Sequence, residues 1–305
     1  MNLISYAHDG RWRAGFSENA ALVPVAACGV QLSACGSEAR SLLEAGPDAL
    51  KAAAAAARKL LASGAAGTLR LEELAVGPPV PDPDKILCLG LNYFAHVGEV
   101  SMEVPKAPIL FPKFRNSLVG PADPIRLPAS SREIDFEGEL AVVIGRRCKD
   151  VSEQDAMSCV AGYACFNDVS ARDVQFVTSQ WTAGKALDTF APMGPGMALA
   201  EDISDPQNLL LTTRVNGDVM QQASTALMMF SVAATIAFIS SLMTLEPGDV
   251  IATGTPAGVG FTRRPPVYLK PGDTVEVEIE RVGTIRNPVR GAVALEGSAD
   301  LDSGR

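Results

Sequence analysis

Three acidic side chains stand at positions where they can act together on a cation. Glu137 and Glu139 enter the apolar run 140–144, and Asp168 follows the apolar run 160–166. On an extended strand, alternate side chains share one face roughly 7 Å apart, so the two glutamates can reach toward one point. Like charges held that close in a partly buried place need a cation, a shared proton or full solvation. Carboxylate oxygens without a soft ligand suit a hard divalent ion: Mg²⁺, Mn²⁺ or Ca²⁺.

A solvated strand face is the structural alternative for the two glutamates, and it is the common place for such a pair. The strongly apolar strand that follows them and the additional acid, Asp168, favour a metal site. Both interpretations stay open at this point, because the sequence alone does not show whether this face is buried.

A possible acid–base pair follows the predicted strand 86–90. If residues 93–100 form a helical turn, His96 and Glu99 lie on one face, and the carboxylate orients the imidazole as a general base. Lys185 lies in a segment with few charges, next to glycine and near aromatic residues, where an ammonium can face a cavity and stabilise an oxyanion. A partly buried histidine and a solvated lysine are the corresponding structural alternatives.

Composition excludes several classes of protein. The chain has 305 residues, 47% of them hydrophobic, which is enough for a substantial core in one or two domains. A net charge of −9 argues against nucleic acids and anionic membranes as partners. There is no apolar run long enough to cross a bilayer and no signal-peptide layout, so we expect a cytoplasmic protein. The six cysteines form no CxxC pair and are expected to be reduced core residues.

The small number of histidines excludes several kinds of catalytic site. Only His8 and His96 are present, so a three-histidine zinc site and an HExxH site are excluded. A Ser-His-Asp triad would have to use His96, and the chain has no G-x-S-x-G elbow. The Walker A and dinucleotide-binding patterns also fail, because Ser179 and Arg263 stand where glycine is required.

The organisation of the chain predicts two domains. Residues 1–75 are expected to form a small N-terminal domain with an alanine-rich helix at 51–62, residues 76–84 a proline-rich linker, and residues 85–305 a β-rich body. Strands are predicted at 86–90, 140–145, 209–216, 250–253 and 274–280, helices at 152–161 and 230–243, and a hairpin turn at Asn216-Gly217. This mixed order argues against a simple Rossmann fold or TIM barrel.

Together these segments resemble the fumarylacetoacetate hydrolase family over roughly residues 80–290. The matching residues, in the family's order and spacing, are Gly90-Leu91-Asn92-Tyr93 with His96 and Glu99, Glu137-Gly138-Glu139-Leu140, Asn167-Asp168-Val169-Ser170-Ala171-Arg172-Asp173, Gly184-Lys185 with Asp188-Thr189-Phe190, and Thr253-Gly254-Thr255-Pro256-Ala257-Gly258. Residues 1–75 resemble the short N-terminal domain of many bacterial members. The resemblance implies an α+β, β-rich fold, namely a mixed β-sandwich roll with a small N-terminal α/β domain, and a homodimer.

The resemblance also implies roles for particular residues and a cofactor, Mg²⁺ or Mn²⁺ with Ca²⁺ as a substitute. The residues concerned are Glu137, Glu139 and Asp168 as metal ligands, His96, Glu99 and Lys185 as catalytic residues, the first two on a mobile lid, and Arg172, Gln175 and Thr255 as substrate-binding residues. In related chains this lysine is followed by Ser-Phe, whereas here Lys185 is followed by Ala186-Leu187. This change can alter the shape of the pocket.

The residues and the resemblance predict a metal-dependent hydrolase that cleaves a C–C bond in a 2,4-dioxo acid. The substrate would be an acylpyruvate, a fumarylpyruvate-like acid or a diketo-deoxy sugar acid, and the products pyruvate and a carboxylic acid. His96 would activate the attacking water and Lys185 would stabilise the oxyanion. The alternatives are a decarboxylase of oxaloacetate or a related β-keto acid, an isomerase or hydratase, and a ligand-binding protein without activity. The expected partner is a small keto acid.

Overall fold

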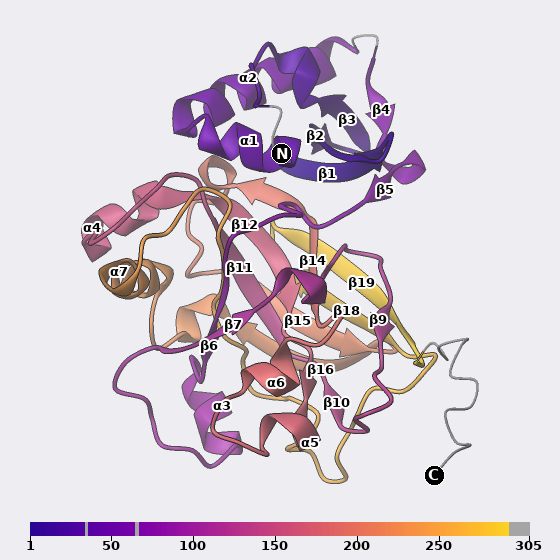
Figure 1. The fold of residues 1–305 in the computed structure, drawn as a ribbon, viewed down its shortest axis with the longest axis vertical. Helices are drawn as coiled ribbons and strands as arrows, with labels where there is room; N and C mark the ends of the chain where they lie inside the picture. Colours follow the sequence, from indigo (N-terminus) through magenta and orange to yellow (C-terminus); the bar gives the residue numbers. More distant parts are fainter. Residues whose placement is uncertain (34–35, 65–66, 293–305) are drawn as a thin grey trace, which may run out of the picture.

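The computed structural model describes residues 1–33, 36–64 and 67–292, and most of its strands join one large mixed sheet. The strands of this sheet are β1 (Asn2–His8), β2 (Arg11–Glu18), β3 (Ala21–Pro24), β4 (Leu69–Arg70), β5 (Ala75–Val76), β6 (Ile86–Gly90), β7 (Ile109–Lys113), β8 (Leu118–Val119), β11 (Gly138–Ile144), β12 (Val160–Asn167), β14 (Ala191–Leu199) and β17 (Val250–Ala252). Their order is β4-β3-β2-β1-β14-β12-β11-β17-β6-β7, with β5 beside β1 and β8 beside β14 (Figure 1).

A second sheet and helix α7 (Val232–Leu242) pack against one face of the large sheet. The second sheet has the order β16 (Asp218–Ser224), β15 (Leu210–Val215), β18 (Thr274–Ile279), β19 (Gly283–Arg290), β9 (Ile125–Arg126), and a small separate pair joins β10 (Ile134–Asp135) to β13 (Ser170–Ala171). The α-helices are α1 (Glu38–Glu44), α2 (Pro47–Ser63), α3 (Phe94–Glu99), α4 (Glu153–Ala156), α5 (Arg172–Gln175), α6 (Thr182–Lys185) and α7 (Val232–Leu242).

Strand β11 lies at the centre of the fold because its apolar run is buried on both faces. Leu140, Val142 and Ile144 pack toward the second sheet and α7, in one core cluster. Ala141 and Val143 belong to another cluster on the opposite face. A strand covered on both faces carries a continuous apolar run rather than an alternating one, and this explains the sequence of β11.

The N-terminal part continues the same sheet. Strand β1 pairs with β14 through Asn2↔Ala198 and Leu3↔Met197, and helices α1 and α2 lie over the N-terminal strands at the top of Figure 1. Helix α2 begins with Pro47 in its first turn and ends at Gly64, whose φ of 61° places it in the left-handed region. Proline at the start and glycine after the end are the expected signals for these two boundaries.

The α+β, β-rich fold class is confirmed, and so is each predicted strand of the body to within about two residues. The hairpin at Asn216-Gly217 is confirmed by the pairing Val215↔Asp218. The predicted helix 152–161 is wrong in length. Ser152 caps α4 as expected, by accepting a hydrogen bond from the amide of Asp155, but β12 already begins at Val160. From Val160 onward the residues pair with β11 instead of continuing a helix. This strand pairing outweighs their local helix propensity.

Two further expectations concern the cysteines and membrane spans. The five cysteines in the described residues are free thiols, as expected, and Cys35 lies outside the described residues. Within the described part of the chain, no helix combines the length and the apolar character needed to cross a membrane.

The second sheet packs closely against the start of β11. A Cβ atom on Gly138 would lie 2.1 Å from Thr213 Oγ1 and 3.3 Å from side-chain atoms of Leu211 and Val277. Glycine is therefore required between Glu137 and Glu139 for the second sheet to pack against this end of the strand.

We expect Gly138→Ala to lower the free energy of unfolding by about 1–3 kcal/mol, because the added methyl overpacks the contact with Thr213. Thr213 Oγ1 has no hydrogen-bond partner among the described residues, so Thr213→Ala removes the obstacle without breaking a bond seen there. Chemical denaturation should show that the double variant recovers most of the lost stability. Additive losses in the double variant would contradict this account of the contact.

Candidate functional site

The ends of two neighbouring strands bring the three carboxylates together. Glu139 lies in β11, Glu137 directly precedes this strand, and Asp168 directly follows β12. The two strands are antiparallel, with Gly138 opposite Asn167, and the amide of Asp168 donates to the carbonyl of Glu137 at 2.9 Å. One oxygen of each carboxylate lies within 4.8 Å of the others, and all three residues are buried. The solvated strand face is therefore excluded.

One oxygen of each carboxylate, here called the outer oxygen, accepts a hydrogen bond that fixes the side chain. The bonds to these outer oxygens are Arg172 Nη2 to Glu137 Oε1 at 2.5 Å, Lys113 Nζ to Asp168 Oδ1, and the amide of Gly254 to Glu139 Oε2 at 2.8 Å. Because the three anchors come from different elements, each side chain is held in one orientation. The second oxygen of each carboxylate takes no part in these three bonds, and we call it the inner oxygen.

The inner oxygens form a set that fits a hard divalent cation. Lys185 Nζ donates to Glu137 Oε2 and to Asp168 Oδ2, both at 2.7 Å. Glu139 Oε1 is buried and has no hydrogen-bond partner within residues 1–33, 36–64 and 67–292. A buried carboxylate oxygen without a partner costs free energy, and three oxygen ligands without sulfur or imidazole suit an oxygen-preferring ion. The donor set thus fits a divalent metal.

Burial and charge shift the pKa values of the two glutamates in opposite directions. Burial would raise the pKa of Glu137, but the positive charges of Lys185 and Arg172 outweigh it, and the pKa lies below its ordinary value. Burial and the negative charges of Asp168 and Glu137 hold the pKa of Glu139 well above its ordinary value. One glutamate is thus stabilised as a carboxylate and the other as an acid.

His96 and Glu99 form a hydrogen-bonded pair on α3. The predicted helical turn is present, and His96 Nδ1 lies 2.8 Å from Glu99 Oε1. Glu99 is held from its other side by the amide of Gly258, at 3.1 and 2.9 Å from its two oxygens, and by the hydroxyl of Thr262 at 3.3 Å. Gly258 has φ 109°, and a Cβ there would lie 2.2 Å from the carbonyl oxygen of Met220, so glycine is required for this contact.

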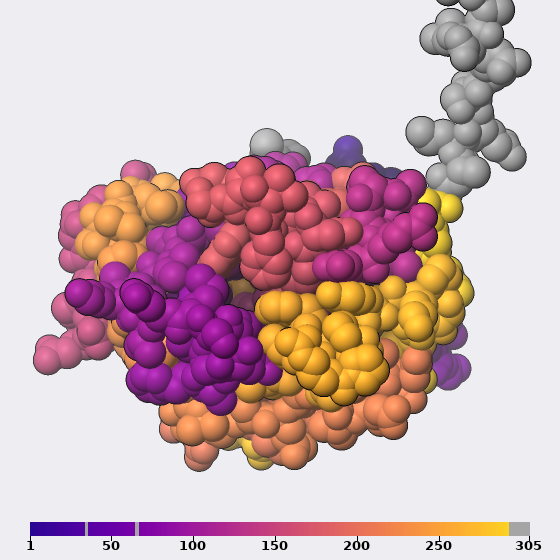
Figure 2. All heavy atoms as spheres, turned by 90° about the horizontal axis from the view of Figure 1, so that it is seen from below, coloured from indigo at the N-terminus to yellow at the C-terminus, as the bar shows by residue number. Residues whose placement is uncertain are grey.

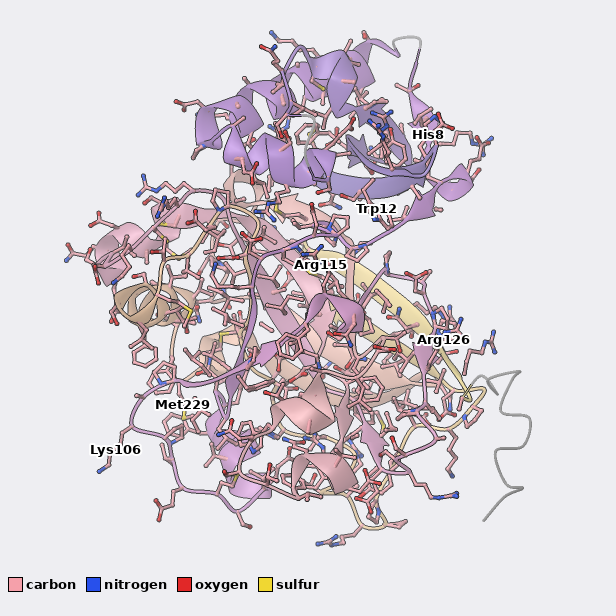
Figure 3. All side chains as sticks on the ribbon, in the orientation of Figure 1. His8, Trp12, Lys106, Arg115, Arg126 and Met229 are labelled. Atoms are coloured by element: carbon pink, nitrogen blue, oxygen red, sulfur yellow. The ribbon has the colours of Figure 1, made fainter. Side chains whose placement is uncertain are left out.

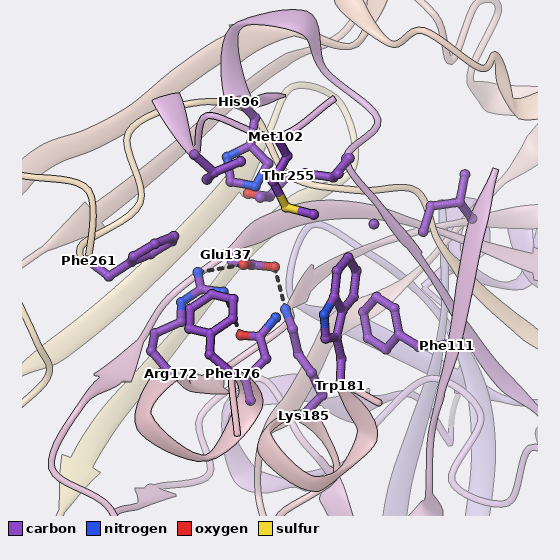
Figure 4. A pocket seen from close by; sticks show the side chains of 15 residues that line it. His96, Met102, Phe111, Glu137, Arg172, Phe176, Trp181, Lys185, Thr255 and Phe261 are labelled. Atoms are coloured by element: carbon purple, nitrogen blue, oxygen red, sulfur yellow. Dashed lines mark hydrogen bonds and ion pairs between the residues drawn. The ribbon is translucent and has the colours of Figure 1, made fainter. Parts of the chain in front are cut away.

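A cavity of about 310 Å³ is lined by His96 of the dyad and by Glu137 of the carboxylate cluster. Its polar lining residues are His96, Glu137, Arg172, Gln175, Lys185 and Thr255, and its aromatic lining residues are Phe111, Phe176, Trp181 and Phe261. Figure 4 shows Lys185 and Arg172 both reaching Glu137, with Trp181 and Phe111 on one side and Phe261 on the other. Seen from below, the molecule is hollowed between the purple, salmon and gold segments that carry these residues (Figure 2).

The three predicted substrate-binding residues line this cavity and are held by other side chains. The guanidinium of Arg172 donates to Asp135 at 3.0 Å and to Gln175 at 2.9 Å, in addition to Glu137. This bond uses the carbonyl oxygen of Gln175, so its amide nitrogen is left to donate elsewhere. Thr255 lines the cavity close to the dyad, and its hydroxyl donates to the carbonyl of Gly138 at 3.0 Å.

Three supporting residues were missed by the sequence analysis. Lys113, at the end of β7, is fully buried behind Asp168, and Asp135 accepts from Arg172 and from the amides of Gly260 and Phe261. Gln221 fixes the glutamate segment by accepting from the amide of Gly138. Asp135 lies two residues before Glu137. Extending the alternate spacing of Glu137 and Glu139 toward the N-terminus would therefore have identified it.

Three other residues named from the sequence do not line the cavity. His8 is in the N-terminal part of the molecule, at the far end from α3 (Figure 3). Leu187 packs into a separate core cluster, and neither it nor Ala186 lines the cavity. The departure from the family pattern at Ala186 and Leu187 therefore lies outside the lining of the cavity.

The opposite pKa shifts predict that amide substitutions of Glu139 and Glu137 change the free energy of unfolding in opposite directions. The measurement is made with EDTA, which removes divalent metal. The pKa of Glu139 is raised, so the folded protein binds more protons than the unfolded chain above about pH 4.3, and stability falls as pH rises. Glu139→Gln should then stabilise the protein at pH 8. The pKa of Glu137 is lowered, so its carboxylate contributes stability above that pH, and Glu137→Gln should cost about 3–5 kcal/mol by breaking a buried pair.

Urea denaturation of both variants across a pH series measures these effects. If both substitutions changed the free energy of unfolding in the same direction at pH 8, the described charge distribution would be contradicted.

Comparisons with known proteins identify the family of the chain. The family model for the fumarylacetoacetate (FAA) hydrolase C-terminal domain matches residues 85–290. The chain is 52% identical over 213 residues to oxaloacetate tautomerase fahd2, mitochondrial, of Xenopus laevis, covering 69% of this chain and 67% of the relative.

Two solved structures share the fold. Fumarylacetoacetate hydrolase from Exiguobacterium antarcticum is 35% identical with a TM-score of 0.80, covering 95% of this chain and 99% of the other. Maleylpyruvate hydrolase from Sphingobium sp. SYK-6, in complex with manganese (II) ion and pyruvate, is 31% identical with a TM-score of 0.79, covering 96% and 100%. With its carboxylate cluster, its His-Glu pair and these likenesses, the chain belongs to the fumarylacetoacetate hydrolase family.

Proposed function

We propose that this enzyme is a divalent-metal-dependent tautomerase that interconverts the keto and enol forms of oxaloacetate or a closely related 2-oxo dicarboxylic acid. The observation that carries the proposal is the 52% identity to an oxaloacetate tautomerase over a segment that includes the carboxylates, the dyad and Lys185. The cavity of about 310 Å³ is of a size for a small acid, and the charged residues lie on its lining.

Glu137, Glu139 and Asp168 are the residues that would hold the ion. Mg²⁺ and Mn²⁺ both prefer such oxygen ligands, and Ca²⁺ is a substitute with the same preference. The manganese-bound maleylpyruvate hydrolase supports this choice by fold. When bound, a divalent ion withdraws electron density from a 2-oxo group and stabilises the negative charge of an enolate.

His96 would move the proton. Glu99 holds Nδ1, so Nε2 is the ring nitrogen left to exchange a proton with a molecule in the cavity. In the keto-to-enol direction, Nε2 takes a proton from C3, the electron pair forms the C2–C3 double bond, and the oxygen on C2 receives the proton. Arg172 and the free amide nitrogen of Gln175 would orient the carboxylates of the substrate.

Hydrolysis of a 2,4-dioxo acid is the second candidate, and the dyad is the observation that favours it. The pair held at 2.8 Å could equally deprotonate a water that attacks the distal carbonyl. The Sphingobium maleylpyruvate hydrolase shares the fold at 31% identity, against 52% for the tautomerase. Decarboxylation of oxaloacetate would instead leave pyruvate and CO₂ without any attacking water.

The enol form of oxaloacetate, added from a dry organic solvent, tests the proposal directly. With Mg²⁺ or Mn²⁺ present, the protein should speed the loss of the enol's ultraviolet absorbance beyond the rate with metal alone. Asp168→Asn should reduce this rate by about 10²-fold or more, because one charged ligand is lost. A rate no faster than metal alone would overturn the proposal.

Replacement of the base separates the candidate reactions. His96→Gln should lower the rate of enol–keto exchange by about 10²–10⁴-fold and leave metal binding intact, because His96 touches the reacting atoms and not the ion. A coupled assay for pyruvate on oxaloacetate and on acylpyruvates is the matched measurement. Pyruvate formation from acylpyruvates, without tautomerisation of oxaloacetate, would favour the hydrolase, and pyruvate formation from oxaloacetate would favour the decarboxylase.

A further inference from the structure

Two buried lysines contact the same carboxylate in different ways. Lys113 donates to the outer oxygen of Asp168 and to the carbonyl of Val169, and its side chain is fully buried. Lys185 donates instead to the inner oxygen of Asp168 and to the inner oxygen of Glu137. Lys113 therefore lies behind the cluster, and Lys185 lies within it.

Lys185 occupies the position that a shared cation requires. The inner oxygens of Glu137 and Asp168 both lie 2.7 Å from its Nζ, and only the inner oxygen of Glu139 is left without a partner. A divalent ion that binds these same oxygens meets the ammonium at close range in a buried site, where like charges repel strongly. The ion and the ammonium therefore compete for the same two carboxylates.

The cavity offers the Lys185 ammonium a second position away from the carboxylates. Lys185 is the last residue of α6, and its side chain lines the cavity. Nζ lies 5.2 Å from the ring centroid of Phe111 in the cavity wall, a position that favours a cation. The four-carbon stem of lysine is flexible, so a small rotation moves the charge from the carboxylates into the cavity. Lys113 has no such freedom, because the cavity lining does not include it.

We propose that Lys185 is an internal counter-cation, which a divalent metal displaces from Glu137 and Asp168 into the cavity, where it then binds the anionic oxygen of the 2-oxo acid. This inference rests on the metal site of the proposed function. It assigns Lys185 two successive partners: metal binding releases the ammonium from the carboxylates and makes it a donor for substrate. Lys113, in contrast, is a positioning residue that holds Asp168 throughout.

The affinity for Mn²⁺, measured by isothermal titration calorimetry at one fixed pH without substrate, tests the inference. Lys185→Met should bind Mn²⁺ about tenfold or more tightly than the unaltered protein, because the competing charge is gone. Lys113→Met is the matched control, since it removes the other buried lysine from the same carboxylate. It should bind Mn²⁺ about 10–100-fold more weakly, as expected for loss of a residue that orients a ligand.

Weaker or unchanged Mn²⁺ binding by Lys185→Met would overturn the inference, because Lys185 would then orient the ligands or play no part in binding. The rise in unfolding midpoint on adding saturating Mn²⁺ is the second measurement, and it should be larger for Lys185→Met than for the unaltered protein. If Lys185→Met folds only with Mn²⁺ present, the inference is supported. If it does not fold under either condition, Lys185→Gln takes its place in both measurements, because its amide still donates to a carboxylate without a charge.

These measurements are independent of turnover. If the protein fails to tautomerise oxaloacetate but the two lysine variants shift Mn²⁺ affinity in opposite directions, the proposed reaction is wrong and the displacement stands. If tautomerisation is found and both variants weaken Mn²⁺ binding, the displacement is wrong and the proposed reaction stands.

Discussion

The structure depends on holding three carboxylates inside the protein with one oxygen of each within 4.8 Å of the others. Like charges at that separation repel, so each one needs its own fixed partner and the group as a whole needs positive charge. The partners are Arg172 for Glu137, Lys113 for Asp168 and a backbone amide for Glu139. Only Glu139 lacks a cationic partner of its own, and its pKa is raised accordingly by burial and by the neighbouring charges.

The fold assembles most of the site where neighbouring strands of the large sheet begin or end. Strand β11 begins there, and β12, β17 and β6 end there. Lys113 is the exception, because it ends β7 opposite Ile86, at the start of β6. The loop after β17 connects the groups to each other: its glycine amides donate to Glu139, to Glu99 of the dyad and to Asp135, which in turn holds Arg172. A displacement of this loop would therefore disturb the carboxylate cluster and the His96–Glu99 pair together.

Most of the site could be predicted from the sequence because its spacing is local. Glu137 and Glu139 at alternate positions, and His96 and Glu99 three residues apart, are brought together by one strand and one helical turn. Lys113 could not be found in this way, because a lysine at a strand end looks like a solvated one and its partner Asp168 is 55 residues away. The early end of α4 was missed for a similar reason, since pairing of Val160 and its successors with β11 is a tertiary effect.

The central claim is that Glu137, Glu139 and Asp168 bind one divalent ion between their inner oxygens. Anomalous diffraction from crystals grown with Mn²⁺ tests it most directly, because the signal locates the metal without any assumption about activity. The account predicts a single strong peak within about 2–2.5 Å of one oxygen of each of the three side chains. No peak there at saturating Mn²⁺, or a peak bound by other residues, would contradict it.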